Sequence, residues 1–120
     1  MKDMNVTFKD KTVFVNSKPV KEFDVPIMEI LIFEKGIAIL LEDYLYSRKY
    51  RNDENVFFID FEGNILWQIR YIGHPYEKGE NPYVGLTKED ETSFWATTFD
   101  GWAYLVDVST GNIIDSEFVK

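Results

Sequence analysis

The ionisable side chains show little that is arranged for catalysis. His74 is the single histidine and it precedes Pro75, so a turn position is a better interpretation than a Ser–His–Asp arrangement. Asn52–Asn55 and Asp60–Asn64 supply oxygen ligands of the kind that calcium uses, but neither has the alternating ligands and bidentate glutamate of a helix–loop–helix site. Acids are plentiful enough for glycoside hydrolysis, yet no pair stands out. We therefore predict no catalytic residue and no metal ligand.

The three tryptophans are candidates for stacking on sugars or bases. Trp67 and Trp95 fall inside expected strands, where core packing is the favoured interpretation. Trp102 follows the Asp100–Gly101 turn and has the best chance of partial exposure. The acidic run Glu89–Glu91 is a possible target for a basic partner, but as a turn between strands it is more simply a solvated segment.

The charge balance excludes several classes of function. The 120 residues include 13 basic and 21 acidic side chains, a formal net charge of −8, and no cysteine. This balance argues against nucleic-acid binding and against anionic membrane surfaces, and it suits a basic protein partner. Without cysteine there is no disulfide, zinc–thiolate site, iron–sulfur cluster or thiol nucleophile. The first five residues lack the apolar core of a secretory signal, so we expect a cytoplasmic protein.

Short β-rich segments bounded by turn signals dominate the chain. The 10 Phe, 7 Tyr and 3 Trp, with many Val and Ile, suit half-buried strands. We predict strands at 5–9, 12–16, 19–24, 27–34, 36–43, 55–61, 64–71, 83–89, 93–99, 102–108 and 112–119. The runs within 30–33 and 37–41 are apolar on both faces, which indicates strands covered on both sides. A helix over 27–45 is the competing interpretation, but Gly36 and the β-branched residues disfavour it.

A repeat organises these strands. Asn16, Asp60 and Asp107 each follow an apolar segment and precede a short turn and an outgoing strand, at spacings of 44 and 47 positions. A four-stranded propeller blade repeats at about 40–45 residues. We expect the Asp or Asn to bond turn amides while a glycine takes the positive φ. Phe23 and Trp67, with Ile114 as the nearest counterpart, should pack onto the neighbouring sheet.

The repeat predicts an all-β fold that is an incomplete β-propeller. A single domain over 1–120 would hold a three-stranded partial blade at 5–24 and two four-stranded antiparallel blades at 27–71 and 83–119. Closed propellers have about four to eight blades, so this chain cannot close a ring alone. Its open blade faces are a structural reason to expect association, including a homodimer.

The motifs also resemble a known family. The segments 60–67 and 107–114 look like quinoprotein-type (PQQ-like) β-propeller repeats, in which an Asp, a Gly turn and an outgoing strand often ending in Trp close each blade. Residues 82–102 are similar to small bacterial proteins built from a few such repeats. The resemblance implies blade architecture over most of the chain. It does not carry over the quinone, whose binding residues have no counterparts here, so no cofactor is expected.

Two long connections interrupt the repeat, at 44–54 and 72–82. In an up-and-down blade both emerge at the same end, and long loops on rigid scaffolds are where binding is usually placed. Both segments mix tyrosine with charge, which is typical of recognition surfaces, although solvated loops have the same composition. The predicted partner-binding residues are Tyr46, Tyr50, Asp53, Glu54, Tyr76, Glu77 and Glu80.

These observations favour a non-enzymatic protein-binding module. Its sharper form is an inhibitor or immunity protein that neutralises a basic toxin such as a nuclease. The alternative is a small-ligand or carbohydrate-binding β-protein, with a hydrolase as one form of it, that uses Trp102 and the loop tyrosines. A third interpretation is a structural fragment that only self-associates.

Overall fold

Eleven strands form the whole of the regular structure in the part of the chain that the computed structural model describes, residues 4–42, 54–70 and 82–118. Every predicted strand is present, with ends displaced by at most three residues. The strands are β1 (Val6–Lys9), β2 (Thr12–Val15), β3 (Lys18–Glu22), β4 (Ile27–Ile32), β5 (Ile37–Leu41), β6 (Val56–Ile59), β7 (Ile65–Gln68), β8 (Tyr83–Asp90), β9 (Ser93–Thr98), β10 (Trp102–Asp107) and β11 (Ile113–Phe118).

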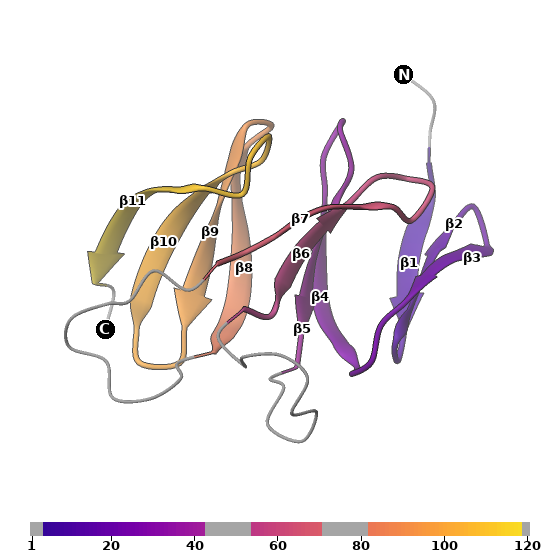
Figure 1. Cartoon of the computed structure of the whole chain (residues 1–120), viewed down its shortest axis with the longest axis horizontal. Coiled ribbons are helices and arrows are strands. Elements are labelled where there is room, and N and C mark those ends of the chain that lie inside the picture. The colour runs from indigo at the N-terminus through magenta and orange to yellow at the C-terminus, as the bar shows by residue number, and fades with distance from the viewer. Residues whose placement is uncertain (1–3, 43–53, 71–81, 119–120) are drawn as a thin grey trace.

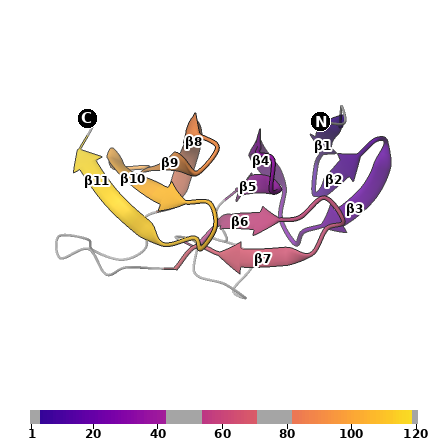
Figure 2. The same ribbon diagram turned by 90° about the horizontal axis from the view of Figure 1, so that it is seen from above.

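The strands make three antiparallel sheets, ordered β1-β2-β3, β4-β5-β6-β7 and β11-β10-β9-β8. Figure 1 shows the sheets side by side, and Figure 2 shows from above how they fan out as blades do. The prediction of an all-β, incomplete β-propeller with two four-stranded blades and one three-stranded blade is confirmed. The competing helix over 27–45 is wrong, because β4 and β5 form a hairpin in which the Phe33 N–H donates to the Gly36 carbonyl at 2.8 Å.

The middle sheet is buried on both faces, which explains its continuous apolar runs. All five residues of β5 and all four of β6 are buried. Along β5, Ile37, Ile39 and Leu41 join a cluster with the first sheet, whereas Ala38 and Leu40 join a second cluster with the third sheet. Since side chains alternate along a strand, one sheet supplies both cores.

The Asp–Gly turns form as predicted in two of the three repeats. Asp60 Oδ1 accepts from the backbone N–H groups of Glu62 and Asn64, both at 2.9 Å, and Gly63 takes a φ of 93°. Asp107 Oδ2 accepts from the Thr110 N–H at 3.1 Å, and Gly111 takes a φ of 78°. The carboxylates therefore replace backbone acceptors that the turns lack.

The first repeat departs from this pattern. Asn16 itself takes a φ of 51° and is followed by Ser17 at 70°. The Asn16 Oδ1 accepts from the backbone N–H of Asn5 on the adjacent strand at 3.0 Å, not from its own turn. The prediction of a turn-bonding side chain is wrong here, because the sequence offers no glycine and asparagine tolerates the left-handed region itself.

The outgoing strands dock on neighbouring sheets, as predicted for Phe23 and Trp67. Phe23 packs against Phe57 of the middle sheet with ring centroids 5.2 Å apart. The Trp67 indole stacks at 9° to Phe94 of the third sheet, with centroids 6.2 Å apart, and its Nε1 donates to the Val108 carbonyl at 2.8 Å. Ile114, at the equivalent place in the last described blade, is 58 % exposed, because no sheet among the described residues packs beyond β11.

Candidate functional site

One end of the molecule, here named the loop end, carries the attachments of both long connections. Backbone hydrogen bonds tie the chain together at this end, one of them between the first two sheets and the others within a sheet. The Ile27 N–H donates to the Asp10 carbonyl at 2.7 Å, the Glu42 N–H to Pro26 at 2.9 Å, and the Leu41 N–H to Asn55 at 2.9 Å. On the third sheet the Phe99 N–H donates to the Pro82 carbonyl at 3.0 Å. The two flanks of the first long connection are therefore bonded to each other, and the end of the second is bonded to the β9–β10 turn.

Asn55 joins these attachments directly. Its side chain is fully buried, and its Nδ2 donates to the Leu41 carbonyl at 2.8 Å and to the Tyr83 carbonyl at 2.9 Å. Its Oδ1 accepts from the Tyr83 N–H at 3.1 Å. One amide thus fixes the end of β5, the start of β6 and the start of β8. A buried amide with three partners is well suited to rigidify a scaffold.

Most of the predicted partner-binding residues lie outside the described residues. These are Tyr46, Tyr50, Asp53, Tyr76, Glu77 and Glu80. Glu54 is described and half-buried, and its carbonyl accepts from Gln68 Nε2 at 2.8 Å, which ties the end of one connection to β7. The prediction that both connections attach at one end agrees with the described flanks. The contact residues themselves stay a prediction.

Phe99 is a surface feature of the loop end that the sequence analysis missed. It is 75 % exposed and lies in the turn between β9 and β10, beside the attachment at Pro82. Its sequence position could have indicated this exposure, because Phe99 directly precedes the Asp100–Gly101 turn, where the alternation of buried and exposed side chains along β9 ends. An exposed aromatic ring of this kind is typical of contact surfaces.

The other two tryptophans differ in their surroundings. Trp102 is half-buried and packs on Phe118 with centroids 5.2 Å apart, so its predicted partial exposure is confirmed. Trp95 is also half-buried, and its Nε1 donates to Glu89 Oε1 at 3.1 Å on the outer side of the last sheet. The prediction that Trp95 lies in the core is wrong, because it occupies the strand face opposite to the buried Phe94.

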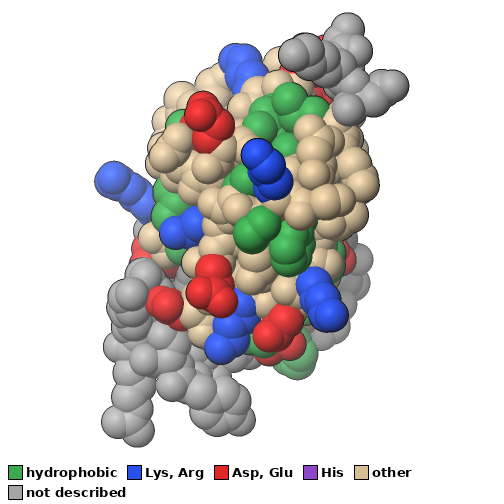
Figure 3. Space-filling model, turned by 90° about the vertical axis from the view of Figure 1, so that its right-hand side faces the viewer, with side chains coloured by type: hydrophobic (Ala, Val, Ile, Leu, Met, Phe, Trp, Pro, Cys, Tyr) green, Lys and Arg blue, Asp and Glu red, His purple; other side chains and the backbone are tan. Residues whose placement is uncertain are grey.

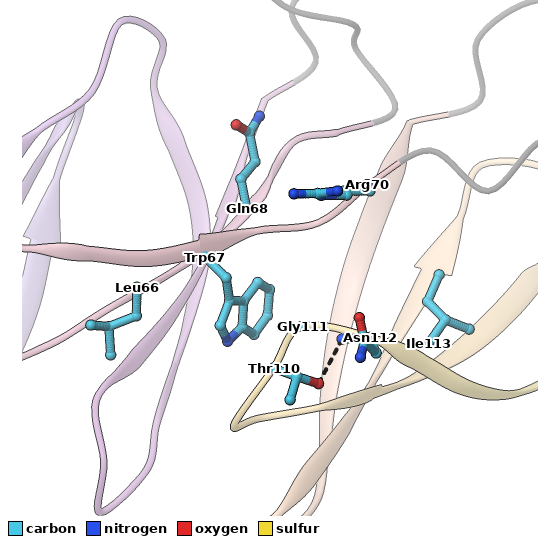
Figure 4. A pocket seen from close by; sticks show the side chains of 8 residues that line it. All are labelled: Leu66, Trp67, Gln68, Arg70, Thr110, Gly111, Asn112 and Ile113. Atoms are coloured by element: carbon cyan, nitrogen blue, oxygen red, sulfur yellow. Dashed lines mark hydrogen bonds between the residues drawn. The ribbon is translucent and has the colours of Figure 1, made fainter.

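A cavity of about 450 Å³ lies between β7 and the turn that joins β10 to β11. Figure 4 shows the Trp67 indole beside Gly111, with Arg70 just after the end of β7 and Asn112 on the turn. A Cβ on Gly111 would lie 2.5 Å from Trp67 Cδ2, so only glycine allows this approach. None of the described residues that line this cavity is a carboxylate. It therefore offers no acid–base pair for hydrolysis.

At the opposite end, here named the turn end, the hairpin-turn carboxylates are already used by the fold. Asp90 Oδ1 accepts from the Thr92 N–H at 2.7 Å, and Glu91 Oε1 accepts from the Glu34 N–H of the middle sheet at 2.8 Å. Hydrogen bonds from Asn64 to Asp60 and from Thr92 to Asp90 lower the pKa values of these two carboxyls. The interpretation of Glu89–Glu91 as only solvated is wrong, because Glu91 links two sheets.

Two searches of the described residues bear on other kinds of site. In residues 4–42, 54–70 and 82–118, no three His, Cys, Asp or Glu side chains lie close enough together to hold a metal ion. Nor do those residues form a helix that is long and apolar enough to cross a membrane.

Solved structures with a similar fold are β-propeller proteins. BamB from Moraxella catarrhalis matches with a TM-score of 0.62 and 14% identity, over 96% of this chain and 33% of that one. The WD40 domain of Neurospora crassa Pan2 matches with a TM-score of 0.59 and 14% identity, over 96% of this chain and 37% of that one. The WD40 β-propeller domain of Doa1 gives 0.55 and 14%, over 92% and 38%.

These similarities establish the fold. The chain spans between a third and two fifths of the length of each of these propellers. A search of curated protein sequences finds no match. The sequence profile of one family, described as a domain of unknown function (DUF7957), matches residues 3–118. Because that match covers nearly the whole sequence, the chain belongs to the DUF7957 family.

Proposed function

We propose that this protein is a non-catalytic binding module whose loop end contacts a basic protein. In the sharper form, it is an inhibitor or immunity protein that neutralises a basic toxin such as a nuclease. The observation that carries the proposal is the Asn55 amide, which holds the attachments of both long connections at one end of a rigid scaffold. Fixing the described flanks of a binding surface relative to one another reduces the conformational entropy that binding would otherwise cost.

The charge of the loop end supports a basic partner. Its described residues that lie between strands carry five carboxylates and two cations: Asp10, Asp24, Glu42, Glu54 and Asp100 against Lys11 and Arg70. Acidic side chains around a binding surface accelerate association with a basic protein and suppress association with acidic ones. The exposed Phe99 supplies an apolar contact at the same end. Acidic steering combined with an aromatic contact suits occlusion of a basic active site.

The open side of the first sheet is less suited to a basic toxin. Figure 3 shows this side of the molecule, where hydrophobic side chains are interspersed with Lys or Arg as well as Asp or Glu. Two of the basic residues on its strands are Lys9 on β1 and Lys18 on β3, both exposed. Mixed charge gives little steering of a basic partner, so we place the toxin contact at the loop end.

Binding kinetics test this proposal. The partner is isolated from the native host with the tagged chain as bait, and association is then measured by surface plasmon resonance at low and high salt. We expect a basic partner whose association rate falls as salt rises, since exposed charges are screened over about 8–10 Å at physiological ionic strength. The double variant Glu42→Gln, Glu54→Gln should associate several-fold more slowly. Phe99→Ala should mainly speed dissociation.

Glu62→Gln is the matched control, because Glu62 is an exposed carboxylate in a turn-end hairpin. Its association rate should equal that of the wild type. A partner without basic character, or a rate that Glu62→Gln lowers as much as the loop-end variant does, would overturn the assignment. Inhibition of the partner's nuclease or other activity separates a toxin inhibitor from a simple binding module.

The small-ligand alternative draws on the cavity between β7 and the β10–β11 turn. Trp67 and Arg70 line that cavity, but the indole is already engaged by Phe94 and by the Val108 carbonyl. The described lining of the cavity gives no support to a hydrolase, because it contains no carboxylate. A change in tryptophan fluorescence on titration with simple sugars, absent in Arg70→Ala, would favour this alternative.

We also propose that the blades are of the quinoprotein (PQQ-like) type. The support is the paired arrangement in which Asp107 closes a turn with Gly111 and the preceding blade's Trp67 lies over that glycine. An alignment of family members tests this. Retention of Asp and Gly at both 60/63 and 107/111 would favour the assignment, and free variation of these positions would contradict it.

A further inference from the structure

Among the described residues, the first sheet has no counterpart of the strand that is innermost in the other two. Asn16 follows β2 as Asp60 follows β6 and Asp107 follows β10, so β1, β2 and β3 correspond to the second, third and fourth strands of a blade. The contacts between sheets agree with this correspondence: β1 contacts β4 as β5 contacts β8. The two innermost strands, β4 and β8, contact each other, and nothing among the described residues occupies the equivalent place beside β1.

The inner edge of β1 presents backbone groups in the position of the absent strand. The Asn16 N–H donates to the Asn5 carbonyl at 2.7 Å, which identifies Asn5 and Asn16 as a hydrogen-bonded pair of the β1–β2 ladder. Because such pairs alternate along an antiparallel ladder, Thr7 and Lys9 also face β2. The N–H and C=O groups of Val6 and Phe8 therefore point toward the open edge.

Apolar side chains remain exposed around the same place. Val6 belongs to the cluster between the first two sheets, so Phe8, two residues further on, lies on the same side, and it is 37% exposed. On β4, Ile32 pairs with Ile37 of the same cluster and is 44% exposed, and Ile30 is half-buried. An open strand edge beside exposed apolar side chains is a ready template for another strand.

We infer that the inner edge of β1 binds an extended segment of a partner protein, which adds as an antiparallel fourth strand and completes the first blade. Such strand addition takes its affinity from main-chain hydrogen bonds and its specificity from alternate side chains. The site lies on a sheet edge and not at the loop end, so it is independent of a toxin contact and goes beyond it.

The chain's own innermost strand indicates the chemistry of that segment. On β4, Glu29 Oε1 accepts from the Leu86 N–H of β8 at 2.8 Å, and Leu31 and Phe33 pack in the cluster shared with the third sheet. Register aligns Leu86 opposite Ala96 and Ile30 opposite Ile39, so Ile30 of β4 corresponds to Leu86 of β8. The partner segment should carry a glutamate that reaches the Ile30 N–H and two apolar residues at the following alternate positions.

A labelled peptide with the sequence of residues 27–34 and two added lysines for solubility provides the probe. Fluorescence anisotropy with the full chain should show saturable binding, and a peptide with the Leu31→Asp and Phe33→Asp changes should bind at least tenfold more weakly. In the protein, Ile32→Lys should weaken binding at least tenfold. Ile65→Lys, at a residue on β7 with a similar exposure of 47%, should leave it unchanged.

The backbone contribution is separated by two variants of one residue. Phe8→Ala removes the ring and keeps the edge N–H, whereas Phe8→Pro removes both and is tolerated on an edge strand whose N–H faces outward. Binding several-fold weaker for Phe8→Pro than for Phe8→Ala supports strand addition. Equal affinities would overturn it, as would the absence of peptide binding or a loss of affinity in Ile65→Lys equal to that in Ile32→Lys.

Two further measurements test the choice of occupant. In sedimentation velocity, the pure chain should show no self-association that the Ile32→Lys variant abolishes. Such self-association would mean that the segment bound at the β1 edge belongs to a second copy of this chain. Hydrogen exchange should show the Phe8 amide unprotected without peptide and protected with it. Protection without peptide would mean that a segment of the protein itself covers the edge, and either result would overturn the proposal of a separate partner.

Discussion

The two contacts between neighbouring sheets share one backbone arrangement but use different side chains. In each, the outer strand of one sheet lies against the glycine of a turn in the next: Val20 against Gly63, and Trp67 against Gly111. The first contact is otherwise made of aliphatic and aromatic packing around Phe23 and Phe57, with a backbone hydrogen bond from the Ile27 N–H to the Asp10 carbonyl. The second is also crossed by hydrogen bonds that involve the side chains of Trp67, Asn55, Glu29, Lys35, Lys88 and Glu91.

This difference separates what the fold needs from what each contact adds. The glycine turn is common to both contacts, because a Cβ there would collide with the preceding strand. The size and polarity of the side chain that lies over it vary. We therefore expect both contacts to fail when the glycine changes, and only the second to depend on one large aromatic residue.

The largest expected effect is that of Trp67→Ala. Its indole stacks on Phe58 and Phe94 and donates to the Val108 carbonyl, so its loss removes packing and leaves that carbonyl without this donor. Truncation of a buried aromatic costs about 3–5 kcal/mol. Val20→Ala at the equivalent place should cost about 1–2 kcal/mol, because truncating a valine removes less buried apolar surface than truncating a tryptophan does. Urea unfolding measures both, and equal losses would contradict the comparison.

The next largest loss of stability is expected for alanine at either turn glycine. Each substitution should cost about 2–4 kcal/mol, because it combines a positive φ with steric overlap of the new Cβ. Gly63→Ala should cost more than Gly111→Ala. The new Cβ would lie 1.9 Å from the Val20 carbonyl oxygen, which is backbone, whereas at Gly111 it would lie 2.5 Å from the Trp67 ring, which is a side chain. The double variant Gly111→Ala, Trp67→Ala should be less destabilised than the sum of its parts, because the two share one contact.

Asn55→Ala tests the polar component of the second contact. Removal of a fully buried amide leaves the Leu41 and Tyr83 carbonyls and the Tyr83 N–H without this partner, which costs about 1–3 kcal/mol. Asn55→Asp should be no less harmful, since a carboxylate would face two carbonyl oxygens. Thermal unfolding followed by circular dichroism gives the loss. A melting temperature equal to that of the wild type in both variants would show that the amide is not a structural link.

The sequence predicts the sheets better than the contacts between them. The spacing of Asn16, Asp60 and Asp107 identified the blades, because turn chemistry is local and each turn is specified by a few adjacent residues. The role of Asn55 was missed, since its partners at Leu41 and Tyr83 are separated from it by 14 and 28 positions. Trp95 was assigned to the core because the pattern of β9 shows two alternating faces without saying which face another sheet covers.

The smallest expected effect is a pH dependence confined to the second contact. The Lys88 ammonium, followed by the Glu34 N–H, lowers the pKa of the Glu91 carboxyl below its ordinary value of 4.5. A lowered folded-state pKa means that the contribution of Glu91 to stability is present above the ordinary value and is lost as pH falls through the folded-state pKa. Acid should therefore loosen the Glu34–Glu91 link while leaving the first contact, where the Ile27 N–H donates to the backbone carbonyl of Asp10, without this response.

Amide chemical shifts followed by NMR between pH 6 and pH 3 measure this response at single residues. The Glu34 amide should titrate with a midpoint below 4.5, the ordinary pKa of Glu91, and should stop responding in Glu91→Gln. The Ile27 amide should keep its shift in both proteins, since its acceptor is not ionisable. A Glu34 response that persists in Glu91→Gln would place the titrating group elsewhere. An equal response at Ile27 would mean that acid loosens both contacts together. The side-chain hydrogen bonds of the second contact would then not set its pH response apart from that of the first.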